Sequence, residues 1–152
     1  MQGAATVFHH PIHPMLVAFP IAFFIGSAGD DVIFLLSRRP FWTKCALALI
    51  GFGILGWLAA ATAGIIDYRT APMTGDALDI AWDHLLVNLA LISIFLLNFA
   101  LRWRHPGAWF GYVLTLAGAA VVLYAGWLGG ELVFRHQVDV APVAHPFTAA
   151  AP

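Results

Sequence analysis

The chain is poor in charged residues. Only 10% of its 152 residues are Asp, Glu, Lys or Arg, whereas 61% are hydrophobic and the mean hydropathy is +0.84. Soluble domains carry about 25% charged residues. A soluble fold with an unusually apolar core is excluded, because four long apolar runs would leave too few polar residues to cover it. The net charge of −1, with histidine neutral, gives no support to nucleic-acid binding.

Cysteine and N-terminal positive charge are also scarce. Cys45 is the single cysteine, which excludes an intramolecular disulfide and a multi-cysteine zinc or iron–sulfur site within one chain. Residues 1–7 contain no Lys or Arg and so lack the basic start of a signal peptide. We therefore expect the first apolar run to remain as a membrane span. No nucleophile–base pair or phosphate loop supports a hydrolase or transferase.

Four apolar runs are long enough to cross a hydrocarbon layer of about 30 Å, which takes about 20 helical residues. The sequence predicts an all-α integral membrane four-helix bundle, with an N-terminal arm at 1–13 and a disordered Ala/Pro-rich tail at 137–152. The expected spans are 14–37, 41–68, 80–103 and 108–136. Small residues spaced along the second and fourth spans, such as the GxxxG pair Gly126 and Gly130, favour close helix packing.

The basic residues predict the orientation of the bundle. Five of the seven lie in or beside the connections between spans one and two and between spans three and four: Arg38, Arg39, Lys44, Arg102 and Arg104. Positive charge marks the cytoplasmic side of a membrane protein. Both termini are therefore expected outside, which is the periplasm for a multi-pass protein of a bacterial inner membrane.

This orientation places polar residues from all four spans at the outer edge, where such groups face the bundle interior more often than lipid. The candidate ligands for a cofactor or metal are His13, His84 and His136. The supporting polar residues are Asp67, Arg69, Asp83, Asn88, Glu131 and Arg135. His9 and His10 are expected to belong to the arm.

Each candidate also has a structural interpretation. His13 suits a helix entry, His84 can hydrogen-bond to Asp83 or Asn88, and His136 suits a helix C-terminus. Glu131 and Arg135, four residues apart, favour an intrahelical ion pair.

Other features have simpler interpretations. Pro20 is expected to kink or loosen the start of the first span. At the opposite edge, one of Asp30 and Asp31 is expected to reach the interface and the other to form a buried helix contact. Tryptophan and tyrosine near the predicted interfaces are typical of an aromatic belt.

Two motifs carry a family resemblance. His13–Ala22 (HPMLVAFPIA) and Gly126–His136 (GWLGGELVFRH) resemble the opening HPMLVHFPIA and closing GWLGGELVYRHG signatures of the bacterial membrane proteins grouped as domain of unknown function 2231. Gly64–Asp67 and the pair His84 and Asn88 also fit that pattern. The resemblance implies four spans and no defined activity, and some relatives look joined to cytochrome-like domains, which favours electron transfer.

The sequence departs from the family pattern at three positions. Ala18 stands where a second histidine is expected, and Gln137 and Asp139 stand where glycines are usual. If the second histidine is a ligand in relatives, this chain either lacks that site or uses another group.

Three functions are compatible with these residues. The leading hypothesis is haem b held by His84 and either His13 or His136, in a protein of electron transfer, with glycines of spans two and four letting the flat macrocycle approach the backbone. The second is a copper or zinc site for binding or transport. The third is a cofactor-free accessory subunit that associates with a redox partner or a second copy.

Overall fold

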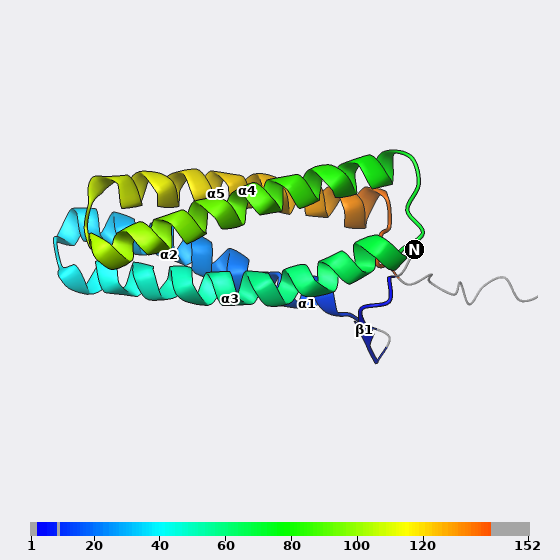
Figure 1. The fold of residues 1–152 in the computed structure, drawn as a ribbon, viewed down its shortest axis with the longest axis horizontal. Helices are drawn as coiled ribbons and strands as arrows, with labels where there is room; N and C mark the ends of the chain where they lie inside the picture. Colours follow the sequence, from blue (N-terminus) through cyan, green and yellow to red (C-terminus); the bar gives the residue numbers. More distant parts are fainter. Residues whose placement is uncertain (1–2, 9, 141–152) are drawn as a thin grey trace, which may run out of the picture.

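Four long helices lie side by side along the length of the molecule (Figure 1). This computed structural model describes residues 3–8 and 10–140. The long helices are α2 (Ala18–Ser37), α3 (Pro40–Thr70), α4 (Asp76–Arg104) and α5 (Trp109–Gly130). Each is long and apolar enough to cross a membrane, α2 together with the short helix α1 (Ile12–Leu16) and α5 together with the π-helical turn η1 (Glu131–Arg135). The predicted all-α fold with four spans is therefore confirmed.

The two ends of the bundle carry different connections (Figure 1). The α2–α3 and α4–α5 connections lie at one end, which we call the two-loop end. The α3–α4 connection, η1 and the first described residues lie at the other, which we call the termini end. A short antiparallel hairpin of β1 (Thr6–Val7) and β2 (His10–Pro11) is also at the termini end. That the termini end faces the periplasm stays a prediction.

The segments flanking the bundle are in part tied to it. The backbone N–H of Gly3 donates to the carboxylate of Asp139 at 2.8 Å, and the side chain of Val138 is buried. The first residues of the segment that was expected to be a disordered tail therefore pack against the bundle. His9 and residues 141–152 lie outside the described residues.

Proline and left-handed residues mark the helix boundaries. Pro20 has no N–H to donate to the carbonyl of Leu16, and α1 and α2 separate at Val17, one turn before the proline. At the two-loop end, Arg38 ends α2 in a left-handed conformation (φ 56°), and Pro40 begins α3 at a position where a missing N–H costs little.

The centre of the bundle is a pair of stacked aromatic rings. Phe24 of α2 and Phe95 of α4 are fully buried, with ring centroids 3.8 Å apart and planes 7° from parallel. Each ring rests against a glycine of a third helix. A Cβ built on Gly53 of α3 would lie 2.4 Å from Phe24, and one built on Gly118 of α5 would lie 2.7 Å from Phe95. All four helices thus meet in one layer, which Ile50, Leu91 and Val122 complete.

We expect Gly53→Ala and Gly118→Ala to lower the thermal unfolding temperature of the detergent-solubilised protein, because the added methyl groups would collide with the stacked rings. Gly126→Ala is the matched control, since no atom lies within 4 Å of its position. That control should leave the temperature unchanged or raise it, as alanine is a better helix former by about 1 kcal/mol. If all three variants had the same unfolding temperature, this would contradict the close packing of Gly53 and Gly118 against the rings.

Candidate functional site

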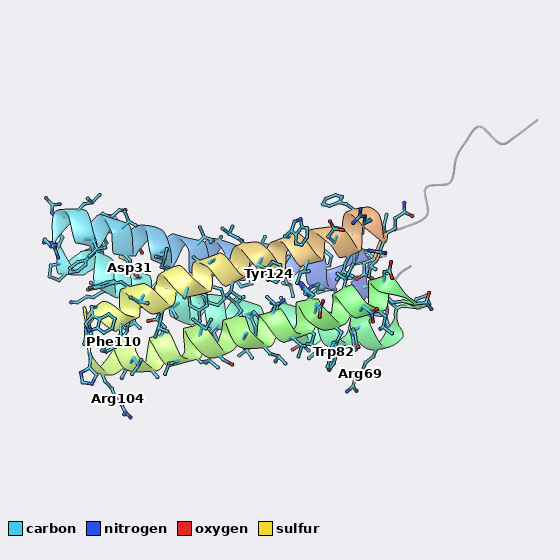
Figure 2. All side chains as sticks on the ribbon, turned by 90° about the horizontal axis from the view of Figure 1, so that it is seen from above. Asp31, Arg69, Trp82, Arg104, Phe110 and Tyr124 are labelled. Carbon is cyan, nitrogen blue, oxygen red and sulfur yellow. The ribbon has the colours of Figure 1, made fainter. Side chains whose placement is uncertain are left out.

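Polar side chains gather at both ends of the bundle. Figure 2 places Asp31 near the two-loop end with Arg104 and Phe110, and places Arg69 and Trp82 near the termini end. The Phe24–Phe95 layer lies between the two groups. The two groups differ in how completely their hydrogen bonds are satisfied.

At the two-loop end, the carboxylate of Asp31 forms a bidentate pair with the guanidinium of Arg102, and both side chains are buried. Arg102 also donates from Nε to Asn98 Oδ1 and from Nη2 to Thr115 Oγ1, each at 2.9 Å. The amide of Asn98 donates to Thr115 at 2.8 Å. We call these four residues the Asp31–Arg102 network. It joins α2, α4 and α5, and such full pairing of buried charges is typical of a structural contact.

Arg102 behaves differently from the other basic residues near the loops. The sequence places Arg102 with the basic residues that mark the cytoplasmic side, but it lies inside α4 and is 3% exposed. It is next to Gly111 of α5, and its Cζ is 5.1 Å from the centroid of the Tyr112 ring. Asp31 is the buried member of the aspartate pair, and Asp30 is half-buried.

At the termini end, a chain of hydrogen bonds sets the tautomer of His84. The indole N–H of Trp57 donates to Asn88 Oδ1 at 3.2 Å. This bond orients the side-chain amide of Asn88, whose nitrogen then faces His84. That nitrogen donates to the backbone carbonyl of His84 at 2.9 Å and lies 3.2 Å from His84 Nε2. Nε2 is therefore an acceptor, and the neutral ring carries its proton on Nδ1. Nδ1 is buried and meets no acceptor with good hydrogen-bond geometry in the described residues, although the backbone of Ala125 on α5 interacts with the ring.

His13 has the same tautomer as His84, but its Nδ1 is the nitrogen that is hydrogen-bonded. Its Nδ1 lies 2.8 Å from the carbonyl oxygen of Ala60 on α3. A carbonyl only accepts, so Nδ1 carries the proton and Nε2 of the neutral ring keeps its lone pair. A Cβ on Gly64 would lie 2.9 Å from His13 Nδ1. Gly64 thus allows the imidazole to lie directly on the helix backbone.

Asp67, near the end of α3, is the third residue of the site. It is 4% exposed, and its Oδ1 accepts the N–H of Ala5 at 2.9 Å. Its Oδ2 is buried without a partner in the described part of the chain. Residues 3–5, which we call the N-terminal strap, lie across this carboxylate so closely that a Cβ on Gly3 would be 2.2 Å from Asp67 Oδ1. Ala4 donates to Thr70 Oγ1 at 2.8 Å.

His13, Asp67 and His84 form one group, which we call the imidazole cluster. His13 lies within electrostatic range of both Asp67 and His84. The cluster offers one carboxylate oxygen without a partner in the described residues (Asp67 Oδ2) and one donor without a well-aligned acceptor there (His84 Nδ1–H). Within residues 3–8 and 10–140, no group of three His, Cys, Asp or Glu side chains is arranged to hold a metal ion.

Apart from Asn88, which bonds to His84, the other predicted site residues are not joined to this cluster by any hydrogen bond or ion pair in the described residues. Glu131 and Arg135 form a 3.1 Å ion pair in η1 with the arginine 75% exposed, a pair worth at most about 1 kcal/mol. Asp83 and Arg69 are exposed. The backbone N–H of His136 donates to the carbonyl of Glu131 and ends η1. His10 bonds to the carbonyl of Phe8 within the hairpin.

Sequence reasoning missed two parts of the site. Trp57 lies in the middle of an apolar run, where nothing in the pattern marks its indole N–H as a partner of Asn88. The N-terminal strap contains only small residues. It covers Asp67 through backbone N–H groups, and these contacts leave no signal in the side-chain sequence. The glycine at position 3 is the one signal that could have indicated a close approach.

The fold and the site define a small four-span helical membrane protein with a polar cluster at one end. The chain belongs to the family described as predicted membrane protein (DUF2231), whose model matches residues 9–142. No curated protein and no solved structure matches the chain.

We expect Asp31→Asn to destabilise the protein by about 3–5 kcal/mol, because it leaves the buried guanidinium of Arg102 without a countercharge. Asp30→Asn is the matched control and should not lower the unfolding temperature, since its half-buried side chain lies outside the network. Thermal unfolding in detergent, followed by circular dichroism, measures both. If the two variants unfold at the same temperature, the structural role assigned to Asp31 is wrong.

Proposed function

We propose that the imidazole cluster is a binding site at the termini end of the bundle, and that its ligand is haem b. The observation that carries this proposal is the tautomer of His13. Metal-ligating histidines ordinarily donate the second ring N–H to a backbone carbonyl or a carboxylate, which orients the ring and leaves the other nitrogen free. His13 has this arrangement, with its Nδ1–H on the carbonyl of Ala60.

The centre of the bundle supports binding over transport. Phe24 and Phe95 are fully buried and stacked, with Gly53 and Gly118 packed against their outer faces. A copper or zinc ion crossing the bundle would have to pass this apolar layer between the two polar groups. A site reached from one end suits a resident cofactor better than a transported ion.

The number of available ligands favours haem over a bare metal ion. Protein sites for zinc use three or four side chains, and the described residues offer no such group. Haem iron takes its other ligands from the porphyrin and needs only axial side chains such as histidine. When bound, haem supplies one-electron chemistry in a site whose burial and hydrogen bonds tune the potential.

The two histidines have different roles in this proposal. His13 presents a lone pair and would hold the haem iron. His84 presents an N–H, because its Nε2 accepts from Asn88, and it is a hydrogen-bond donor to the bound group. The glycines expected to admit the macrocycle instead contact the imidazoles: Gly64 lies against His13, and a Cβ on Gly129 would lie 3.3 Å from His84. They position the rings and add no room for the porphyrin.

We expect a Soret band in the visible spectrum of protein purified after expression with haem supply. His13→Ala should abolish the band, because it removes the imidazole that would hold the iron. His84→Ala should keep the band but shift the reduction potential, since a hydrogen-bond donor next to the haem is lost. His136→Ala is the control and should match the wild type. Absence of a Soret band in the wild type overturns the haem assignment.

A cofactor-free accessory subunit is the second candidate, and one observation favours it. A Cβ built on Gly126 would meet nothing within 4 Å beyond its own helix backbone, and one on Gly130 would meet only Phe134 of η1, so no other helix of the described bundle packs closely on the GxxxG pair of α5. Such a pair allows close approach of another helix. If this function holds, Gly126→Ile should weaken a complex seen by native mass spectrometry, while the visible spectrum shows no haem.

A further inference from the structure

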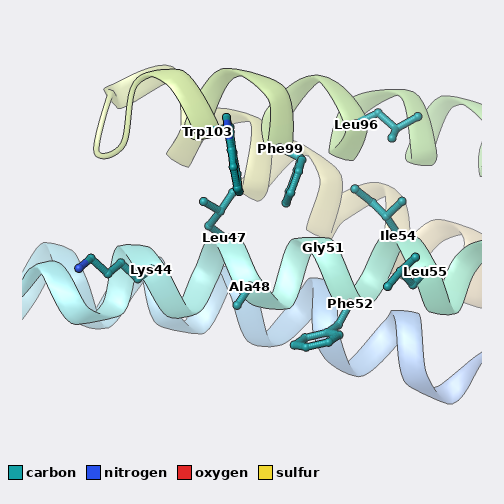
Figure 3. Close-up of a pocket in the computed structure, with 10 residues that line it drawn as sticks. All are labelled: Lys44, Leu47, Ala48, Gly51, Phe52, Ile54, Leu55, Leu96, Phe99 and Trp103. Atoms are coloured by element: carbon teal, nitrogen blue, oxygen red, sulfur yellow. The ribbon is translucent and has the colours of Figure 1, made fainter.

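A groove of about 590 Å³ opens between α3 and α4 toward the two-loop end (Figure 3). Its size lies in the range of about 300–1,000 Å³ usual for sites that bind small molecules. Its walls are apolar, with Leu47 and Leu55 on α3 opposite Leu96 and Phe99 on α4. Lys44 is the charged residue of this lining, and Figure 3 shows its side chain extending toward the loop end of α3.

A second hollow of about 320 Å³ continues the groove at the two-loop end. It shares Lys44 and Leu47 with the groove and is otherwise lined by residues of the two connections and the helix ends beside them, among them Thr43 and Gly107. Lys44 therefore stands where a long apolar groove passes into a hollow between the loops. An occupant of both hollows would have an apolar part along α3 and α4 and a polar part beside Lys44.

The charge at this junction is positive and not neutralised. Lys44 is the single lysine of the chain, and among the described residues its ammonium forms no ion pair. The nearby carboxylate of Asp31 is already paired with Arg102. A basic pocket between membrane helices is a recognised site for anionic lipid headgroups, and a lysine binds phosphate as a point charge.

We propose that the groove between α3 and α4 binds an acyl chain of an anionic phospholipid, whose phosphate contacts the ammonium of Lys44. A second copy of this chain is a poorer occupant. Copies in one membrane share their orientation, so only the acids of the two-loop end, Asp30 and Asp31, would come to the depth of Lys44, and Asp31 is held by Arg102. This proposal is independent of the imidazole cluster, which lies at the opposite end.

Native mass spectrometry tests the proposal. The delipidated protein in detergent is mixed with phosphatidylglycerol or with phosphatidylcholine of the same acyl chains. We expect several-fold more phosphatidylglycerol adduct than phosphatidylcholine adduct. Lys44→Gln should remove this preference, because the charge contact is lost. Ala48→Phe should reduce adducts of both lipids, since position 48 lines the groove and is exposed.

Two controls match these variants. Arg104→Gln removes an exposed positive charge at the same end, and Ala59→Phe adds the same bulk at an exposed position of α3 outside the groove. Both should bind phosphatidylglycerol as the wild type does. If Ala48→Phe fails to fold, fluorescence quenching by phosphatidylglycerol brominated in its acyl chain replaces it: the wild type should lose more emission than Trp103→Phe, because Trp103 lines the groove.

Three results would overturn the proposal. The first is equal retention of the two lipids by the wild type. The second is a preference for phosphatidylglycerol that survives Lys44→Gln. The third is a dimer that carries no lipid and dissociates in Ala48→Phe, which would make a second copy of the chain the occupant.

Discussion

The contact between the rings of Phe24 and Phe95 is the constraint on which the rest of the bundle depends. Inside a bilayer, apolar side chains gain little by leaving lipid for another helix, so helix association requires close packing and buried polar contacts. The stacked rings reach a centroid separation of 3.8 Å, and Gly53 and Gly118 allow α3 and α5 to approach Phe24 and Phe95 closely. One layer thus sets the spacing of all four helices.

The polar groups on the two sides of this layer differ in kind. Arg102 is buried with Asp31, Asn98 and Thr115 as partners. Tyr112 Oη beside Arg102 is buried without a partner in the described residues, but both charged groups of that network are paired. At the termini end, the carboxylate oxygen Asp67 Oδ2 is buried without a partner in the described residues, and His84 Nδ1 has no well-aligned acceptor there. Buried polar atoms in native proteins are nearly all paired, and an exception calls for an explanation such as a ligand or a bound water. This difference is why the function is proposed for the termini end and the network at the other end is interpreted as structural.

The sequence was sufficient for the fold, because four apolar runs of the right length leave few alternatives. It also indicated that one of the two adjacent aspartates would be buried. It was insufficient for Arg102, since a basic residue at a span boundary looks the same whether it faces the cytoplasm or a carboxylate of another helix. The predicted orientation does not depend on it: without Arg102, four of the six remaining basic residues, Arg38, Arg39, Lys44 and Arg104, still lie at the two-loop end.

The roles of the site residues were harder to predict from the sequence than the fold was. Whether His13 is a helix-entry residue or a ligand depends on its tautomer, and the tautomer depends on a carbonyl 47 residues away in the chain. Glycine spacing predicted a stripe of close contacts but not which side chains fill them. Gly118 receives Phe95 and Gly64 receives His13, whereas Gly126 receives nothing. These pairings are properties of the packed helices, and no local pattern encodes them.

The N-terminal strap has a consequence for the order in which the protein is built. Gly3 bonds to Asp139 and Ala5 bonds to Asp67, so the strap is secured by two residues that are synthesised after it, one in the last turn of α3 and one beyond η1. Until Asp139 has been synthesised, the carboxylate of Asp67 is covered incompletely. The termini end therefore reaches its final packing only after the residues beyond η1 have been made.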